Sequence, residues 1–309
     1  MKRFSLAIHG GAGTILKAEM SAEKEMAYKN ALNESLEIGH ELLAKGGTSV
    51  EAVELAVKSL EDSHLFNAGK GSVFSADGTN EMEASIMEGQ HLMAGAVAGV
   101  KNVKNPVALA RMVMEKSEFV YLTGEGVMEF AREQGALFET DEYFFDAFRY
   151  EQWQALKNSN SAQLDHSTAK DRKFGTVGAV ALDVHGSLAA ATSTGGLTNK
   201  KYGRVGDSSI IGAGNYANNA TCAVSCTGYG EYFLRGVVAY DVSALMEYRE
   251  LSLEDASSLV IRQKMVRLGG EGGLIAVDAK GNVSMPFNSE GMYRACVGSD
   301  IPLFIGIYK

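Results

Sequence analysis

The sequence predicts an α+β fold in which layered β-sheets are covered by helices on both faces. Short apolar segments typical of strands stand at both ends of the chain, at residues 4–8, 273–278, 292–297 and 303–308. Between them lie segments with the 3.6-residue apolar period of amphipathic helices. The 309 residues are enough for one large domain or two smaller ones.

The first third of the chain alternates strands with helices. The strand at residues 4–8 ends in a glycine cluster, and residues 22–44 predict a long helix that stops at Gly46 and Gly47. Thr48 begins the next helix, with Glu51 placed to complete a capping box. Further along, residues 93–100 predict a strand, and residues 107–116 and 124–134 predict helices.

Residues 150–172 differ in character from the rest of the chain. They are polar, rich in Ser, Asn, Gln and Lys, and have no clear period, so we expect an exposed connector at which the chain can be cut. After it, residues 177–183 and 187–193 predict a hairpin of small residues around a turn. Strands at 208–212 and 221–226 and helices from about residues 231 and 253 complete the prediction.

Composition excludes several classes of function. The net charge of −9 argues against a nucleic-acid partner, because a phosphate backbone selects a basic surface. No apolar stretch approaches the ~20 residues of a membrane span, and the first residues do not form a secretion signal, so we expect a cytoplasmic protein. The cysteines are too few for a disulfide framework and form no metal-site pattern, which predicts buried thiols: Cys222, Cys226 and Cys296.

Thr176 lies in the segment FGTVG, where the polar connector meets a strand. The simpler interpretation is a structural threonine. If the Gly175–Thr176 bond breaks, however, Thr176 gains an α-amine beside its hydroxyl. An α-amine has a reference pKa of ~7.7–8.0, so one residue then holds a nucleophile and its base.

Thr194 lies at the far end of the same predicted hairpin, in TSTGG. Because adjacent strands lie only about 4.8 Å apart, Thr194 is expected within hydrogen-bond reach of Thr176. The alternative is an ordinary hydroxyl-rich strand end.

Two further segments contain recognisable chemistry. In GRVGD, Arg204 and Asp207 stand among glycines, where they could hold an α-carboxylate and an α-ammonium group, although a surface salt bridge is the simpler alternative. The segment SCTGYGE, at 225–231, predicts a strand end, a glycine loop and a helix start. Main-chain N–H groups at such a point suit an oxyanion, unless this is a plain strand-to-helix turn.

Together these segments resemble the plant-type asparaginases and isoaspartyl peptidases, a family of N-terminal-nucleophile (Ntn) hydrolases. The resemblance covers essentially the whole chain and is closest to the bacterial isoaspartyl peptidases. It rests on IHGGAG near the start, LFNAGKGSVF, EMEASIMEG, the tail GGLIAVDAKGNVSMPFNSEGMYRA and, above all, the run GTVGAVALDVHGSLAAATSTGGLTNKKYGRVGDSSIIGAGNYANN.

The resemblance implies a single domain over residues 1–309 with a four-layer αββα Ntn-hydrolase sandwich. It also implies an inactive precursor that cleaves itself before Thr176. The products would be an α chain of residues 1–175 and a β chain of residues 176–309, which stay together. Two such pairs would then assemble into a dimer of αβ heterodimers.

The family's functional residues fall on matching positions of this sequence. The resemblance implies that Thr176 is the nucleophile, with Thr194 supporting its hydroxyl. Arg204 and Asp207 are implied to bind the substrate's α-carboxylate and α-amine. Thr227 and Gly228 would form the oxyanion hole, and Gly230 would line the pocket. Asn67 would support the site, and the loop at 9–13 would lie close to the scissile bond.

No cofactor is expected for the chemistry itself, but the family carries a structural sodium ion held by backbone carbonyls. Oxygen ligands of this kind suit a hard cation. In this sequence the implied carbonyl donors are those of Leu60, Glu61, Ser63, Phe66, Ala68 and Lys70.

Three residues depart from the family's pattern. Glu83 stands where most relatives carry Asp, which puts the packing of its segment in doubt. Ser209 replaces a common proline and could loosen the turn after Asp207. Lys70 brings a charge to a position that is often apolar. None of the three is the nucleophile or a member of the Arg204–Asp207 pair.

The function implied is hydrolysis of β-aspartyl (isoaspartyl) dipeptides and of the side-chain amide of L-asparagine, giving L-aspartate. Alternatives within the family are a glycosylasparaginase, whose subgroup is usually secreted or lysosomal and richer in cysteine, and a threonine endopeptidase resembling taspase. An alternative of another class is a non-catalytic member that binds aspartyl ligands and never matures. Retention of Thr176, Thr194 and Thr227 argues against it, because binding needs only Arg204 and Asp207.

Overall fold

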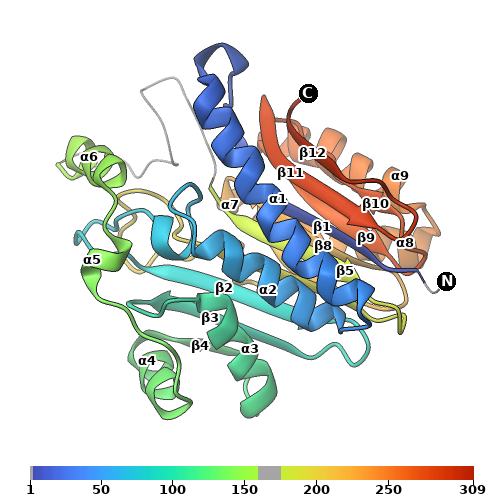
Figure 1. Cartoon of the computed structure of the whole chain (residues 1–309), viewed down its shortest axis with the longest axis horizontal. Helices are drawn as coiled ribbons and strands as arrows, with labels where there is room; N and C mark the ends of the chain where they lie inside the picture. Colours follow the sequence, from blue (N-terminus) through green and yellow to red (C-terminus); the bar gives the residue numbers. More distant parts are fainter. Residues whose placement is uncertain (1–2, 159–174) are drawn as a thin grey trace.

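The computed structural model describes residues 3–158 and 175–309, which form two β-sheets with helices packed against them (Figure 1). The larger sheet has eight strands in the order β12-β11-β1-β5-β6-β2-β3-β4. Its neighbouring strands are antiparallel except β3 and β4, which are parallel. The strands are β1 (Ser5–Gly13), β2 (Met82–Glu88), β3 (Ala94–Val100), β4 (Tyr121–Thr123), β5 (Val177–Leu182), β6 (Leu188–Thr194), β11 (Gly291–Gly298) and β12 (Phe304–Tyr308).

The smaller sheet has four antiparallel strands in the order β10-β9-β8-β7. They are β7 (Asn215–Ala217), β8 (Cys222–Gly228), β9 (Gly272–Asp278) and β10 (Val283–Ser284). Strands β8 and β9 contact β1, β5 and β6, so the smaller sheet packs on one face of the larger one.

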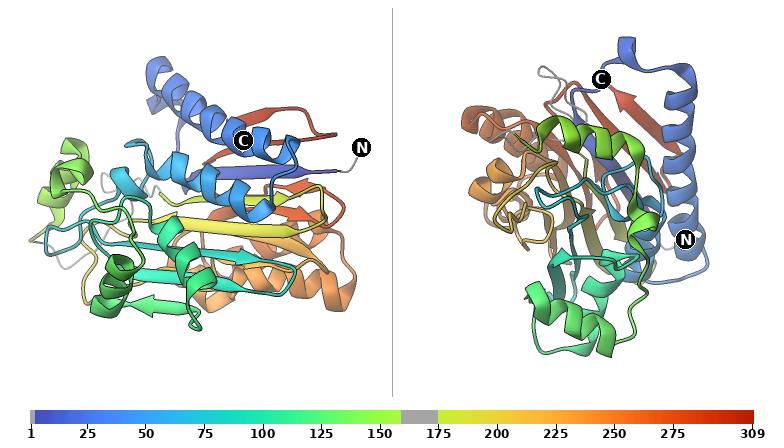
Figure 2. Two further views of the ribbon diagram at one scale, coloured as in Figure 1. Left: turned by 60° about the horizontal axis from the view of Figure 1, so that its bottom comes forward. Right: turned by 90° about the vertical axis from the view of Figure 1, so that its left-hand side faces the viewer.

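Helices α1 (Ala22–Ala44), α2 (Ser49–Glu61) and α3 (Pro106–Lys116) contact the larger sheet, and α8 (Val238–Arg249) and α9 (Leu253–Leu259) contact the smaller one. In Figure 2, the blue helices and the orange helices lie on opposite sides of the sheets. The other helical segments are η1 (Lys17–Glu19), η2 (Gly69–Gly71), α4 (Gly124–Glu133), α5 (Asp141–Phe144), α6 (Ala147–Leu156), α7 (Gly230–Gly236), the π-helical η3 (Val260–Met265) and α10 (Val266–Leu268).

Buried apolar side chains form three main clusters, and alternation along each strand assigns its two faces to different clusters. In β5, Val177 belongs to the cluster shared with α1 and α2, whereas Val180 belongs to the cluster between the two sheets. In β9, Ile275 faces the cluster between the sheets and Leu274 faces the cluster shared with α8 and α9. The predicted mixture of sheets and covering helices is therefore confirmed.

The larger sheet interleaves strands from both sides of the Gly175–Thr176 bond. Strand β1 lies between β11 and β5, and β2 pairs with β6. A chain cut at this bond would therefore remain joined through the strand pairing and through the clusters on both faces of the sheet.

Several local predictions are confirmed residue by residue. Helix α1 spans the predicted residues and ends before Gly46, which has a φ of +88°. The side chain of Thr48 accepts from the N–H of Glu51, and the Glu51 carboxylate accepts from the N–H of Thr48, as expected of a capping box. The three cysteines are buried and free.

The strand predicted at 208–212 is wrong. The N–H of Ile210 donates to the carbonyl of Asp207 at 2.9 Å, and the N–H of Gly212 donates to the carbonyl of Asn215 at 2.8 Å. These local bonds turn the chain, and Gly212 adopts a φ of +91°. The strand of this region is β7, which begins three residues after Gly212.

The prediction of an irregular connector over residues 150–172 is wrong in its first part, where α6 is helical. The carboxylate of Asp146 accepts from the N–H of Arg149 at 2.9 Å, which caps the start of this helix. Trp153 packs on Phe74 with ring centroids 6.1 Å apart. The remainder of the predicted connector, from residue 159 onward, lies outside the described residues.

Across residues 3–158 and 175–309, no helix is both long and apolar enough to cross a membrane.

Close packing of α3 on β3 yields a test of this architecture. A Cβ added at Gly95 in β3 would overlap the carbonyl oxygen of Ala110 and lie 2.6 Å from the main-chain nitrogen of Met114, both in α3. Gly95→Ala is therefore expected to lower the free energy of unfolding by about 1–3 kcal/mol, measured from the denaturant midpoint.

Gly126→Ala in α4 is the matched control, because nothing lies within 4 Å of the added Cβ. Alanine is the better helix former, so this variant should equal the parent or exceed it by up to about 1 kcal/mol. Equal midpoints for the two variants would contradict the packing of α3 on β3.

Candidate active site

Thr176 precedes β5 directly, and Thr194 is the last residue of β6. The antiparallel register pairs Val177 with Ser193, so the two threonines meet at the end of the hairpin. The Thr176 hydroxyl donates to Thr194 Oγ1 at 3.3 Å. The predicted proximity of Thr176 and Thr194 is confirmed, and both side chains are buried.

The hydroxyl of Thr194 has a defined direction. It donates to the carbonyl oxygen of Gly175 at 2.9 Å, and it accepts from the N–H of Gly196 at 3.0 Å as well as from Thr176. The Thr194 hydroxyl proton therefore points at the carbonyl oxygen of the Gly175–Thr176 peptide bond, while a lone pair of Thr194 Oγ1 faces the Thr176 hydroxyl. One side chain thus polarises this carbonyl and orients the oxygen that could attack it.

Asn67 supports this arrangement from the segment between α2 and η2. Its side-chain amide donates to the carbonyl of Gly196 at 2.8 Å, and its main-chain carbonyl accepts from the N–H of Gly195 at 3.0 Å. The Nζ of buried Lys200 donates to the carbonyl of Gly195 at 2.9 Å. The sequence did not predict this role of Lys200, because nothing in the polar run NKKYG indicates that the first of its two lysines is buried.

Asp207 is buried, and within the described part of the chain its Oδ2 has no hydrogen-bond partner. Burial raises the pKa of Asp207 to about 7, and the negative charge of Glu83 acts in the same direction. A Cβ at Gly230 would lie 2.8 Å from Arg204 Nη2 and 2.9 Å from Asp207 Oδ1. Gly230 thus keeps the space beside these opposite charges clear.

Arg204 forms a bidentate pair that sequence reasoning did not predict. Its Nε and Nη2 donate to the two carboxylate oxygens of Glu231, each at 3.0 Å. Glu231 lies in the first turn of α7, directly after Gly230. The side chain of Glu231 is 41% exposed and that of Arg204 is 17% exposed, so the pair stands at the edge of the pocket.

Two of the departures from the family pattern contact each other. The buried Glu83 carboxylate accepts from the N–H of Gly206 at 2.9 Å and from the Ser209 hydroxyl at 2.9 Å. Glu83 therefore anchors the turn before Asp207, and Ser209 supplies a donor that proline lacks. The third departure, Lys70, places its Nζ 5.1 Å from the ring centroid of Tyr143.

Thr227 and Gly228 end β8. The Thr227 hydroxyl is buried, and the described residues offer it no hydrogen-bond partner, which leaves a donor free for a bound group. A Cβ at Gly228 would overlap the ring of Phe233, so this position requires glycine.

His9 lies in β1 and contacts the main chain of Thr176. Its Nδ1 is 3.0 Å from the carbonyl oxygen of Thr176, and its Nε2 is 2.9 Å from Ser225 Oγ. Complete burial lowers the pKa of His9 to about 3, although the bond to Thr176 opposes this shift. The sequence predicted only that the loop at 9–13 lies close to the scissile bond, and it carried no signal of the contact with Ser225.

The pocket at these residues has a volume of about 10 Å³, which is room for about one water molecule. Gly175 itself lines it, so the residue before Thr176 takes up space in this pocket. The lining residues are Glu83, Gly175, Thr176, Thr194, Gly196, Leu197, Arg204, Gly206, Asp207, Ser208, Gly228 and Gly230.

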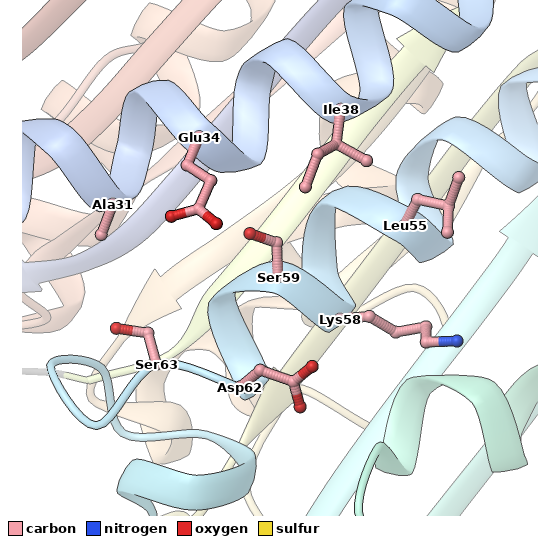
Figure 3. A pocket seen from close by; sticks show the side chains of 8 residues that line it. All are labelled: Ala31, Glu34, Ile38, Leu55, Lys58, Ser59, Asp62 and Ser63. Carbon is pink, nitrogen blue, oxygen red and sulfur yellow. The ribbon is translucent and has the colours of Figure 1, made fainter.

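A cavity of about 450 Å³ lies between α1 and α2 (Figure 3). Its lining includes Glu34, Lys58 and Asp62. It contains neither the threonine pair nor the opposed charges of Arg204 and Asp207. Size alone therefore does not identify the site. Within residues 3–158 and 175–309, no group of three or more His, Cys, Asp or Glu side chains is placed to hold a metal ion.

Comparison with known proteins finds relatives over the full length of this chain. The family model described as Asparaginase matches residues 2–303. The isoaspartyl peptidase of Salmonella typhimurium is 53% identical over 313 residues and is covered along its whole length, as is this chain. That of Escherichia coli K12 is 51% identical over 313 residues, covering all of this chain and 97% of the relative.

A human relative, isoaspartyl peptidase/L-asparaginase, is 41% identical over 298 residues, covering 96% of this chain and 94% of the relative. The match therefore extends along essentially the whole chain, and the matched span covers the positions of the candidate site. This chain belongs to the asparaginase family.

Proposed function

We propose that this protein is a threonine hydrolase that activates itself by cleavage before Thr176. Its reaction is the hydrolysis of β-aspartyl dipeptides and of the side-chain amide of L-asparagine, with L-aspartate as product. The observation that carries the proposal is the pair of bonds at Thr194, which joins the Thr176 hydroxyl to the Gly175 carbonyl. Relatives named isoaspartyl peptidase, 51–53% identical over the full chain, support the substrate class.

Maturation begins with attack of Thr176 Oγ1 on the carbonyl carbon of Gly175. A C–O bond forms, the C–N bond of the peptide breaks, and the nitrogen takes a proton to become the α-amine of Thr176. Water then hydrolyses the resulting ester, which releases a carboxylate on Gly175 and restores the Thr176 hydroxyl. Thr194 serves this step by polarising the carbonyl and accepting from the attacking hydroxyl.

In the mature enzyme, the α-amine of Thr176 takes the proton from its own hydroxyl. Oγ1 attacks the β-carbonyl of the substrate, and the Thr227 hydroxyl with the N–H of Gly228 stabilises the oxyanion. The amine then protonates the leaving nitrogen, so ammonia or an amino acid departs. A water molecule, activated by the same amine, hydrolyses the aspartyl ester and frees L-aspartate.

The charged pair beside Gly230 selects the substrate. Arg204 binds the α-carboxylate and Asp207 binds the α-ammonium group. Both groups are free in L-asparagine and in an amino-terminal aspartyl residue linked through its β-carboxyl. Ordinary α-peptides and internal residues lack one of them and are excluded. A glycosylasparaginase would share this pair, which makes the leaving group the point to be tested.

Several properties of the mature protein follow from the family resemblance and belong to this proposal. They are a single domain with a four-layer αββα Ntn-hydrolase sandwich, an α chain of residues 1–175 with a β chain of residues 176–309, and a dimer of αβ heterodimers in the cytoplasm. The three hydrophobic clusters between sheets and helices support the layering. The shared larger sheet supports retention of both chains after cleavage.

The loop between α2 and η2 fits the structural sodium ion that the resemblance implies. It doubles back so far that an added Cβ at Gly69 would overlap the carbonyl oxygen of Glu61, and one at Gly71 would overlap that of Phe66. The carbonyl oxygens of Glu61 and Phe66 thus face the main chain of η2 at close range, which supports a site with oxygen ligands for a hard cation.

The proposed sodium ligands are the carbonyls of Leu60, Glu61, Ser63, Phe66, Ala68 and Lys70. Those of Phe66 and Ala68 also accept main-chain N–H groups at 2.9 and 3.1 Å, and each of these two carbonyls has a second lone pair for the ion. The carbonyl of Leu60 accepts from the N–H groups of both Asp62 and Ser63, so it would have to share its lone pairs with the ion. The ion would hold this loop, and with it Asn67, without taking part in the reaction.

Cleavage and turnover are tested together. Intact mass spectrometry of the purified protein should show two chains that meet at Gly175 and Thr176, and these should hydrolyse β-Asp-Leu, L-asparagine or both. Thr176→Ala should remain one chain without activity, while Thr176→Ser, which keeps a hydroxyl, should still be cut.

Turnover only of N-acetylglucosaminyl-asparagine would favour a glycosylasparaginase. A single uncut wild-type chain after prolonged incubation, without turnover of any of these substrates, would show a non-catalytic binding protein instead.

Arg204→Lys separates binding from cleavage. Lysine keeps the charge but loses the bidentate geometry, so the KM for β-Asp-Leu should rise about 10–100-fold, while cleavage before Thr176 proceeds. Arg235→Lys, the same change at an exposed position of α7, is the control and should leave KM unchanged. An unchanged KM for Arg204→Lys would remove Arg204 from the proposed site.

The raised pKa of Asp207 predicts a pH dependence. Below about pH 7 its carboxyl group is neutral in the free enzyme and binds an α-ammonium group poorly, so kcat/KM should fall about tenfold per pH unit. Bound substrate lowers this pKa, so kcat should lack this fall. Glu83→Gln removes a like charge and should move the fall in kcat/KM to lower pH. If kcat and kcat/KM both fell in the same way below pH 7, the titrating group would instead be the α-amine of Thr176.

A further inference from the structure

The imidazole of His9 is buried beside the nucleophile, yet the proposed reaction gives it no task. Strand β1 pairs with β5 so that His9 lies opposite Gly178. From there the ring reaches the carbonyl oxygen of Thr176 through Nδ1 and Ser225 of the smaller sheet through Nε2. His9 thus joins the main chain of Thr176 to the second sheet.

The two contacts determine which ring nitrogen carries the proton. A carbonyl oxygen only accepts, so Nδ1 must be the donor to Thr176. A neutral imidazole has one N–H, which leaves Nε2 as an acceptor for the Ser225 hydroxyl. Burial keeps His9 neutral near pH 7, because its pKa is lowered to about 3.

A second hydroxyl continues this row of hydrogen bonds. Thr192 Oγ1 lies 2.7 Å from Ser225 Oγ and 3.3 Å from the carbonyl oxygen of Gly214. Since the Ser225 proton is used on His9, Thr192 donates its one proton mainly in the shorter contact to Ser225 and shares it with the carbonyl of Gly214 in the longer one. All three side chains are buried, so solvent does not compete for these bonds.

The glycine at 178 is explained by this row. A Cβ there would overlap Ser225 Oγ and His9 Nε2. Any other residue at this point of β5 would push the imidazole and the serine apart. The second glycine of FGTVG therefore preserves the contact between His9 and Ser225, two residues after the nucleophile.

We propose that His9 is a positioning residue for Thr176. As an Nδ1–H imidazole, kept in that tautomer by Ser225 and Thr192, it fixes the main-chain carbonyl of Thr176 and hence the direction of the hydroxyl. This inference rests on the proposed function of Thr176 as nucleophile.

The need for such a contact is greatest after cleavage. In the uncut chain Thr176 is held from both sides by peptide bonds, but in the β chain it becomes a terminal residue, and chain ends fray unless something ties them down. The His9 bond ties the carbonyl of the terminal residue. A displacement of about 1 Å at a nucleophile can cost about 10²-fold in rate.

Nitrogen NMR tests the tautomer directly. The protein contains six histidines. With ¹⁵N-labelled histidine in the full chain at pH 7, the signal lost in His9→Asn identifies His9. The Nδ1–H tautomer is expected. An Nε2–H tautomer or an imidazolium ion would overturn the proposal whether or not the protein is active.

Two substitutions at His9 separate positioning from packing. The amide nitrogen of asparagine stands about as far from the main chain as Nδ1, whereas that of glutamine reaches to about the position of Nε2. His9→Asn should therefore keep kcat within about tenfold of wild type, and His9→Gln should lose about 10²-fold, with KM unchanged in both. Equal losses of kcat in the two variants, or losses in KM, would show a merely structural role.

Ser225→Ala gives an independent test that leaves the ring in place. Without the serine donor, the Nε2–H tautomer of His9 should become populated in the NMR spectrum and kcat should fall with it. Ser35→Ala is the matched control, since Ser35 is also buried and donates to the carbonyl of Ala56 in α2, away from His9. An unchanged tautomer and kcat in Ser225→Ala would contradict the assigned role of Ser225.

These results are distinguishable from failure of the proposed function. A wild-type chain that neither cleaves nor hydrolyses β-aspartyl substrates would refute that function, even with the expected tautomer. An active wild-type enzyme in which His9 carries its proton on Nε2 would refute the positioning role alone.

Discussion

The arrangement of the candidate site depends on the pairing of β5 with β1 on one side and β6 on the other. The β6 pairing brings Thr194 to Thr176, and the β1 pairing brings His9 to the same residue. A register shift of one residue would turn Thr176 to the opposite face of the sheet and break both contacts. The glycine and alanine residues of β5 and β6 make this close pairing compatible with a second sheet packed directly above.

More carboxylates than cations meet in the pocket and at its edge. Arg204 and Lys200 face Glu83, Asp207 and Glu231 across a small volume. The pKa of Asp207 is raised, because burial disfavours its charged form and the nearby carboxylates outweigh the effect of Arg204. An aspartyl ligand with one ammonium and one carboxylate group would supply a cation for Asp207 and a further anion for Arg204, which matches the polarity of the site.

Much of this structure could be predicted from local sequence. Helix α1 and the capping box at Thr48 follow from periodicity and end signals, and the meeting of Thr176 and Thr194 follows from the two arms of one hairpin. The strand predicted at 208–212 is a turn. Its two isoleucines suggest a strand, and the main-chain hydrogen bonds that close the turn leave no signal in the sequence. The helix α6 was misread as a connector because its stability depends on aromatic contacts with distant Phe74.

The contacts that could not be predicted join residues far apart in sequence. Glu83 meets Ser209, Arg204 meets Glu231, and His9 meets Ser225, and no spacing or composition reports such pairs. Each depends on how the two sheets and their loops come together. The two departures at Glu83 and Ser209 illustrate this, since each looks like a local weakness and together they form one hydrogen-bonded contact.

The interleaving of strands from both sides of residue 175 has a consequence for the lifetime of the protein. A single chain can unfold and refold many times, because its parts never separate. Once the bond before Thr176 is cut, unfolding releases two polypeptides, each with an incomplete set of strands for the larger sheet. Recovery then requires an encounter between two aggregation-prone fragments, so the mature protein would have to persist through slow unfolding. After cleavage, the protein would therefore be unable to refold readily once it has unfolded, because its two chains were folded as one.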